Sequence, residues 1–119
     1  MAMEGLKLVL KDAVKTELSR AAEKFGVLNK NDHESYAIIL EEWEEMQDEI
    51  ENAKYNLEEF WQWSKDNKMY VATERKVQYL KYMREAMYNA LAEGIQVIAM
   101  LDKAIATEVH NAQPQTFDE

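Results

Sequence analysis

The segment LAEGIQVIAML, residues 91–101, decides the fold of this chain, because it places apolar residues on nearly every side of one helix. Its only charged side chain is Glu93. A helix of this pattern is expected to be buried, and a buried carboxylate is costly unless a partner compensates its charge. The segment therefore predicts a packed helical protein in which Glu93 meets a positive partner, most simply a metal ion.

Working outward from this segment, the remainder of the chain also favours helices. The 119 residues include only 3 Gly and 1 Pro, and Pro114 stands near the C-terminus, so long helices are allowed. Apolar residues at three-to-four spacing predict a first helix over 4–25 and a second from 33 to 52 or onward to 64. A third is expected from about 71–75 to 109, with an interruption near Gly94 left open. No alternation typical of strands is found.

Local signals predict where these helices begin and end. Gly26 is a natural helix stop, Asp32 is a candidate N-cap, and SKDNK (64–68) is the expected break between the second and third helices. We interpret residues 1–109 as a single all-α domain, an antiparallel helical bundle of three to four long helices. Residues 110–119 are expected to form a flexible C-terminal tail.

Charge and composition exclude several classes of function. The formal net charge of −9 argues against binding a nucleic-acid polymer, whose phosphates select basic surfaces. No apolar run reaches the roughly 18 residues of a transmembrane helix, so no membrane partner is expected. The chain has 0 Cys and no signal-peptide pattern, and both features favour a cytoplasmic protein.

A cluster of acids, EEWEE (41–45), is the second candidate for function. Glu41 and Glu45 lie one turn apart on a helix and Glu42 flanks them, so like charges are crowded on one face. One interpretation is an ordinary solvated helix face. The other is a divalent-cation site, because Mg²⁺ and Mn²⁺ prefer carboxylate oxygens and Glu93 would complete the set of ligands.

Polar residues next to Glu93 favour the second interpretation. Asn89 lies one turn before Glu93 and Gln96 three residues after it, which makes a narrow polar strip across an apolar helix. Such strips are typical of metal or ligand sites in bundle cores. Aromatic residues elsewhere are expected in the core or at an interface, namely Tyr55, Phe60, Trp61 and Trp63.

Three stretches taken in order resemble a known family. They are AAEKFG (21–26), HESYAIILEEWEE (33–45) and LAEGIQVIAMLDKA (91–104). Together they are similar to the MazG-like, all-α nucleoside triphosphate pyrophosphohydrolase superfamily, and most closely to its small phage and prophage members. The likeness covers roughly residues 18–106.

The resemblance implies an activity. Such enzymes hydrolyse a nucleoside triphosphate (NTP or dNTP) between the α and β phosphates, releasing a monophosphate and pyrophosphate, with Mg²⁺ or Mn²⁺ as cofactor. Glu41, Glu42, Glu45 and Glu93 match the acids that hold the metal and carry catalysis, and Gln96 stands at the fifth ligand position. The resemblance also implies a homodimer or homotetramer with a role in nucleotide-pool housekeeping.

One departure from the family pattern keeps a second hypothesis open. The family has ExxD where this chain has Glu93 followed by Gln96, and an amide carries no negative charge and cannot act as a base. Lower metal affinity is expected. The alternative function is therefore a non-catalytic MazG-like helical protein of phage or prophage origin that binds or assembles with partners.

Overall fold

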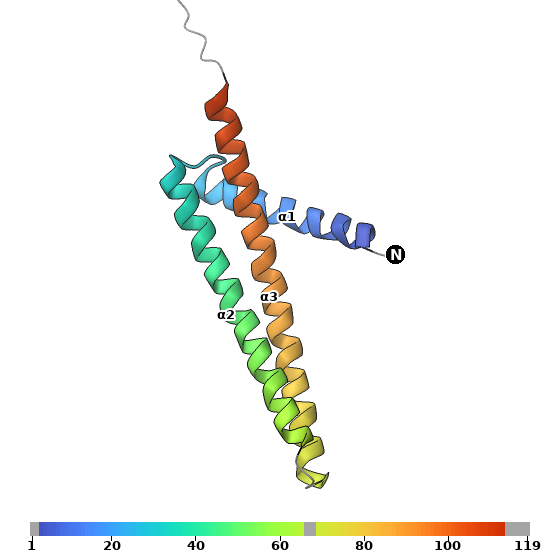
Figure 1. Cartoon of the computed structure of the whole chain (residues 1–119). Helices are drawn as coiled ribbons and strands as arrows, with labels where there is room; N and C mark the ends of the chain where they lie inside the picture. The colour runs from blue at the N-terminus through green and yellow to red at the C-terminus, as the bar shows by residue number, and fades with distance from the viewer. Residues whose placement is uncertain (1–2, 66–68, 114–119) are drawn as a thin grey trace, which may run out of the picture. The chain divides into compact units, whose positions relative to one another are not determined.

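The structure, a computed structural model, describes residues 3–65 and 69–113 (Figure 1). Three helices make up these parts of the chain, and no strand occurs in them: α1 (Met3–Phe25), α2 (Asp32–Ser64) and α3 (Met69–Ala112). The all-α prediction is therefore confirmed, with three helices.

The chain divides into two compact units. The first unit comprises Met1–Glu42 and Ile95–Glu119, and the second comprises Trp43–Gly94. The first unit thus holds α1, the start of α2 and the end of α3, whereas the second is the hairpin formed by the rest of α2 and α3. α2 and α3 are unbroken where the chain passes from one unit to the other.

The turn between α1 and α2 follows local backbone chemistry. Gly26 ends α1 with a φ of 87°, a left-handed conformation that favours glycine, and its N–H donates to the carbonyl of Ala22 at 2.9 Å. The stop predicted at Gly26 is confirmed. The N-cap of α2 is Asn31, whose Oδ1 accepts the N–H of Glu34 at 2.9 Å, so the assignment of Asp32 as cap was wrong by one residue.

α2 and α3 extend beyond the shortest ranges that the sequence predicted for the second and third helices. α2 continues to Ser64 because neither Gly nor Pro interrupts it, and α3 passes through Gly94 without a break. In the second unit Gly94 faces α2, since a Cβ built there would lie 3.6 Å from Sδ of Met46. α3 ends at Ala112, three residues into the range predicted as a tail, and residues 114–119 lie outside the described residues.

The core of the first unit forms where α1 lies across the other two helices (Figure 1). Val14 of α1 packs with Ala99 and Met100 of α3, and Ala99 is fully buried. The absence of a large side chain at Ala99 lets the helices approach closely. Partly buried apolar residues surround this centre: Leu18, Ala21, Ile38, Ile39 and Ile95.

A buried set of hydrogen bonds joins the α1–α2 turn to α3 in the first unit. The N–H of Asn29 donates to Oγ1 of Thr107 at 2.9 Å, and that hydroxyl donates to the carbonyl of Lys103 at 2.8 Å. The Asn29 side chain donates from Nδ2 to Oγ of Ser35 at 2.8 Å. Because Thr107 is only 1% exposed, these bonds hold the turn against α3 without competition from water.

The second unit is an antiparallel helical hairpin. Met46 lies near Gly94, and Glu49 accepts a long hydrogen bond of 3.4 Å from Asn89, so positions advance on α2 as they recede on α3. Small buried residues allow the helices to pack closely, namely Ala53, Ala72, Ala86 and Ala90. Nearby, the buried Asn56 side chain donates to the carbonyl of Asn52 at 2.8 Å.

Many large apolar side chains remain exposed, which corrects the burial expected along 91–101. In the segment 91–101, expected to be buried, Leu91 is 55% exposed and Ile98 is 42% exposed. Tyr55 and Trp61 are exposed, with Lys65 Nζ 5.8 Å from the ring centre of Trp61, so of the two places expected for them, core or interface, the interface stays a prediction. None of the described helices is long and apolar enough to cross a membrane.

Candidate functional site

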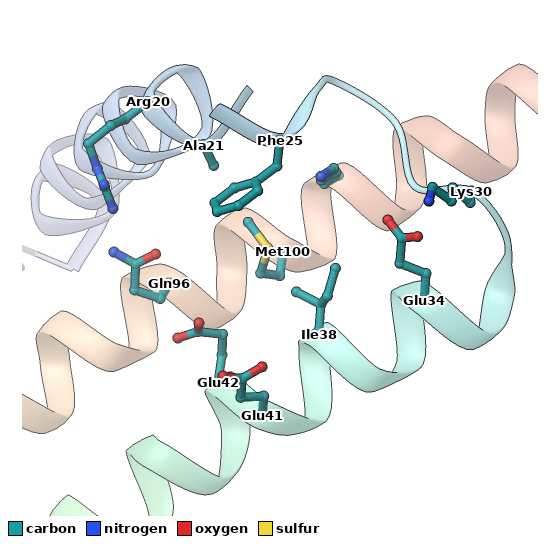
Figure 2. A pocket seen from close by; sticks show the side chains of 11 residues that line it. Arg20, Ala21, Phe25, Lys30, Glu34, Ile38, Glu41, Glu42, Gln96 and Met100 are labelled. Atoms are coloured by element: carbon teal, nitrogen blue, oxygen red, sulfur yellow. The ribbon is translucent and has the colours of Figure 1, made fainter. Parts of the chain in front are cut away.

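A cavity of about 460 Å³ opens in the first unit. All three helices and the α1–α2 turn contribute to its wall, so it exists only because α1 lies across α2 and α3. Its volume is within the range of small-molecule sites. The side chains drawn in Figure 2 form this wall: Arg20, Ala21, Phe25, Lys30, Glu34, Ile38, Glu41, Glu42, Gln96, Met100 and Lys103.

The cavity has polar ends and an apolar middle (Figure 2). Glu41 and Glu42 of α2 lie toward one end, and Lys30 and Glu34 lie at the other. The ring of Phe25 sits between these ends, above the side chains of Met100 and Ile38 (both labelled in the figure). An elongated ligand with an apolar or aromatic part and charged groups would match this distribution.

Gln96 is held by α1. Arg20 donates to Oε2 of Glu17 from Nη2 at 2.7 Å and from Nε at 3.1 Å. These bonds from Arg20, followed by a side-chain hydrogen bond with Gln96, hold the pKa of Glu17 below its ordinary value. Because Glu17 is ionised and can only accept, the Gln96 amide nitrogen is the donor, which leaves the amide oxygen for another partner.

Two of the predicted acids meet in the second unit. Glu45 of α2 and Glu93 of α3 each offer a carboxylate oxygen, and these oxygens lie within 4.8 Å of each other. Glu93 is half-buried, less than the burial expected from the sequence, and its carboxylate approaches that of Glu45 in the EEWEE stretch.

The five predicted site residues are thus placed in two groups. Glu41, Glu42 and Gln96 line the cavity of the first unit, while Glu45 and Glu93 come together in the second unit. Two acids adjacent to these groups have other surroundings: Glu44 is exposed, and half-buried Glu49 is the acceptor from Asn89.

The donor chemistry of the acids fits a hard divalent cation. Ligand oxygens around one octahedral Mg²⁺, each about 2.1 Å from the ion, lie about 3–4 Å apart. The carboxylates of Glu45 and Glu93 need only small side-chain movements to reach that spacing, since their oxygens are already within 4.8 Å. Mn²⁺ has the same preference for oxygen ligands.

The cationic side chains of the cavity were not predicted from the sequence. Arg20, Lys30 and Lys103 line it, and none of them was singled out from the sequence. A signal was present for Lys103, because it follows Gln96 by seven residues, or two helical turns, and so shares its face of α3. Asp102, one position earlier, instead lines a separate apolar cavity with lysines of α1.

No protein-family model, no curated protein and no solved structure matches this chain. The resemblance to MazG-like pyrophosphohydrolases therefore stays a prediction from the quoted residues. The structure itself shows the all-helical fold, the cavity and the close approach of Glu45 and Glu93.

Proposed function

We propose that this chain is a Mg²⁺- or Mn²⁺-dependent hydrolase of nucleoside triphosphates that releases pyrophosphate. The observation that carries the proposal is the approach of Glu45 and Glu93, because residues 48 positions apart in sequence bring carboxylate oxygens within 4.8 Å. A divalent cation held between two carboxylates on facing helices would offset the repulsion of their like charges. The cavity of the first unit supports the proposal, since it combines cationic, acidic and aromatic side chains.

The roles of the chain's residues follow from this chemistry. Glu45 and Glu93 would hold the cation in the second unit, and Glu41, Glu42 and Gln96 would offer oxygen ligands from the cavity wall of the first unit. A bound Mg²⁺ would neutralise phosphate charge and supply an activated water. Glu49 is half-buried one turn beyond Glu45, close enough in sequence to orient a water as a base. The ring of Phe25 offers a surface on which a nucleobase can stack.

The experiment that tests this function measures pyrophosphate release from a panel of ribo- and deoxynucleoside triphosphates with Mg²⁺ or Mn²⁺. We expect release that stops when EDTA removes the metal, and the best substrate in the panel identifies the base and sugar preference. Folded protein that releases pyrophosphate from no member of the panel contradicts the proposal.

The second candidate function is a non-catalytic helical protein that binds or assembles with partners. Exposed apolar residues favour it, including Trp43 at 47%, Tyr88 at 64% and Leu91 at 55% exposure in the second unit. Gln96 favours it too, since an amide carries no negative charge and so binds a cation less strongly than a carboxylate does. Stabilisation by Mg²⁺ without hydrolysis of any nucleotide would select this function over the enzyme.

Both candidate functions are compatible with a homo-oligomer, which we also propose. Exposed apolar side chains gathered on a small protein usually mark an interface. Sedimentation equilibrium should therefore give a mass of two or four times the 14.0 kDa of one chain. The double variant Leu91→Lys and Ile98→Lys, at two exposed positions, is expected to lower that mass, whereas Lys54→Met at an exposed position should leave it unchanged. A wild-type mass of one chain at all concentrations contradicts oligomerisation.

A further inference from the structure

Lys103 is a nearly buried, charged residue of the cavity wall to which neither candidate function assigns a role. The residue is only 3% exposed, although its side chain ends in a charged ammonium group. It nevertheless contributes to the wall of the cavity in the first unit. Within residues 3–65 and 69–113 no salt bridge of Lys103 is found.

A lysine side chain that is almost fully buried keeps little contact with water, so its charged end gains from an anionic partner in the cavity that it lines. Packing alone does not require a lysine here, since a methionine would fill similar space at less electrostatic cost. The backbone at this position is also fixed, because the carbonyl of Lys103 accepts the hydrogen bond from Thr107 at 2.8 Å. The side chain therefore enters the cavity from a rigid part of α3.

We propose that Lys103 binds a phosphoryl group of a polyphosphate ligand in this cavity, with Lys30 as the second cationic contact. Lys30 lines the same cavity from the α1–α2 turn, so the two ammonium groups come from different elements of the first unit. Arg20 is less suited to the role, because Glu17 already accepts two of its hydrogen bonds. Lysine binds phosphate as a compact point charge and needs no fixed orientation.

The acids of the cavity favour a polyphosphate over a carboxylate ligand. Glu34, Glu41 and Glu42 line the cavity together with the three cations, so a bare anion would be repelled at the acidic end. A polyphosphate can meet both kinds of side chain, because one part accepts from lysine while another part shares a divalent cation with carboxylates. This inference rests on the proposed function only where the polyphosphate is that of a nucleotide.

The test compares binding of inorganic pyrophosphate, in the presence of Mg²⁺, by wild-type protein and by Lys103→Met in isothermal titration calorimetry. We expect the Kd to rise by about tenfold or more in Lys103→Met, because a hydrogen bond to a charged group is lost. Lys54→Met, which removes an exposed lysine of the second unit, should bind as the wild type does. An α,β-methylene nucleoside triphosphate, which resists hydrolysis, separates a nucleotide ligand from free pyrophosphate.

A second readout keeps the test decisive if folding changes. Ligand-free Lys103→Met should melt at the same temperature as the wild type or higher, and pyrophosphate should raise the melting temperature of the wild type more than that of the variant. Equal pyrophosphate affinity in the two proteins, or no binding by the wild type, overturns the proposal. Nucleotide hydrolysis with an unchanged KM in Lys103→Met also overturns it while leaving the enzyme intact. Pyrophosphate binding that depends on Lys103 without any hydrolysis supports the anion site and contradicts the enzyme.

Discussion

Substituting Glu93→Gln is expected to reduce pyrophosphate release by about 100-fold or more, because an amide cannot replace a charged ligand of the metal. Glu93 is half-buried on α3 and its carboxylate oxygen lies within 4.8 Å of that of Glu45, so few other groups can take its place. Initial rates at saturating Mg²⁺ and nucleotide, measured alongside circular dichroism, check this result. The helical signal should be unchanged, because Gln is as good a helix former as Glu.

The matched control for this substitution is Glu44→Gln. Glu44 belongs to the same EEWEE stretch, but it is exposed and is not among the grouped acids. Its removal should leave the rate within about twofold of the wild type, because exposed single charges contribute little. A wild-type rate in Glu93→Gln would remove Glu93 from the site. Equal losses in both would indicate that the net charge of α2 and α3 matters rather than a specific ligand.

Substituting Ala99→Leu is expected to lower the free energy of unfolding by about 1–3 kcal/mol, because added methylene groups overfill a packed core. Ala99 is 0% exposed where Val14 of α1 packs against Met100 of α3. The loss is a large share of the roughly 5–15 kcal/mol that stabilises a typical domain. Urea denaturation followed by circular dichroism measures the change.

Ala106→Leu is the control for this second prediction. Ala106 lies seven residues beyond Ala99 on the same helix, but it is exposed, so a larger side chain there meets solvent. Its stability should stay within about 0.5 kcal/mol of the wild type. A loss in Ala106→Leu equal to that in Ala99→Leu would show that α1 does not pack tightly at Ala99. Ala99→Leu should also weaken pyrophosphate binding, since Arg20 and Phe25 of α1 form part of the cavity wall.

The fold was predictable because its signals are local. Few breakers occur in the chain, and Gly26 marks a helix end through a conformation that glycine adopts readily. Asn31 and Asp32 are both good caps and adjacent, so sequence alone did not separate them. Burial along 91–101 was overestimated because periodicity shows which face is apolar but not whether anything covers it. Leu91 and Ile98 remain exposed for that reason.

The candidate site was predictable only in its acidic part. Acids clustered on one helix and a lone acid on another are visible in sequence, and Glu45 and Glu93 do come together in the structure. The cationic part was not visible in the same way, because Arg20, Lys30 and Lys103 belong to three different elements. They share one wall only through the position of α1, which depends on long-range contacts such as Val14 with Ala99.

The number of residues in the short turn between α1 and α2 sets the width of the cavity on one side. Phe25 stands just before the turn and Lys30 within it, and both line the cavity, while the acids of α2 and α3 lie on regular helices. Residues inserted between Gly26 and Asn29 would enlarge the opening on one side and leave the spacing of the acids as it is. Insertions in this one turn can therefore change the size of the ligand that the cavity admits, without moving the acids proposed to hold the cation.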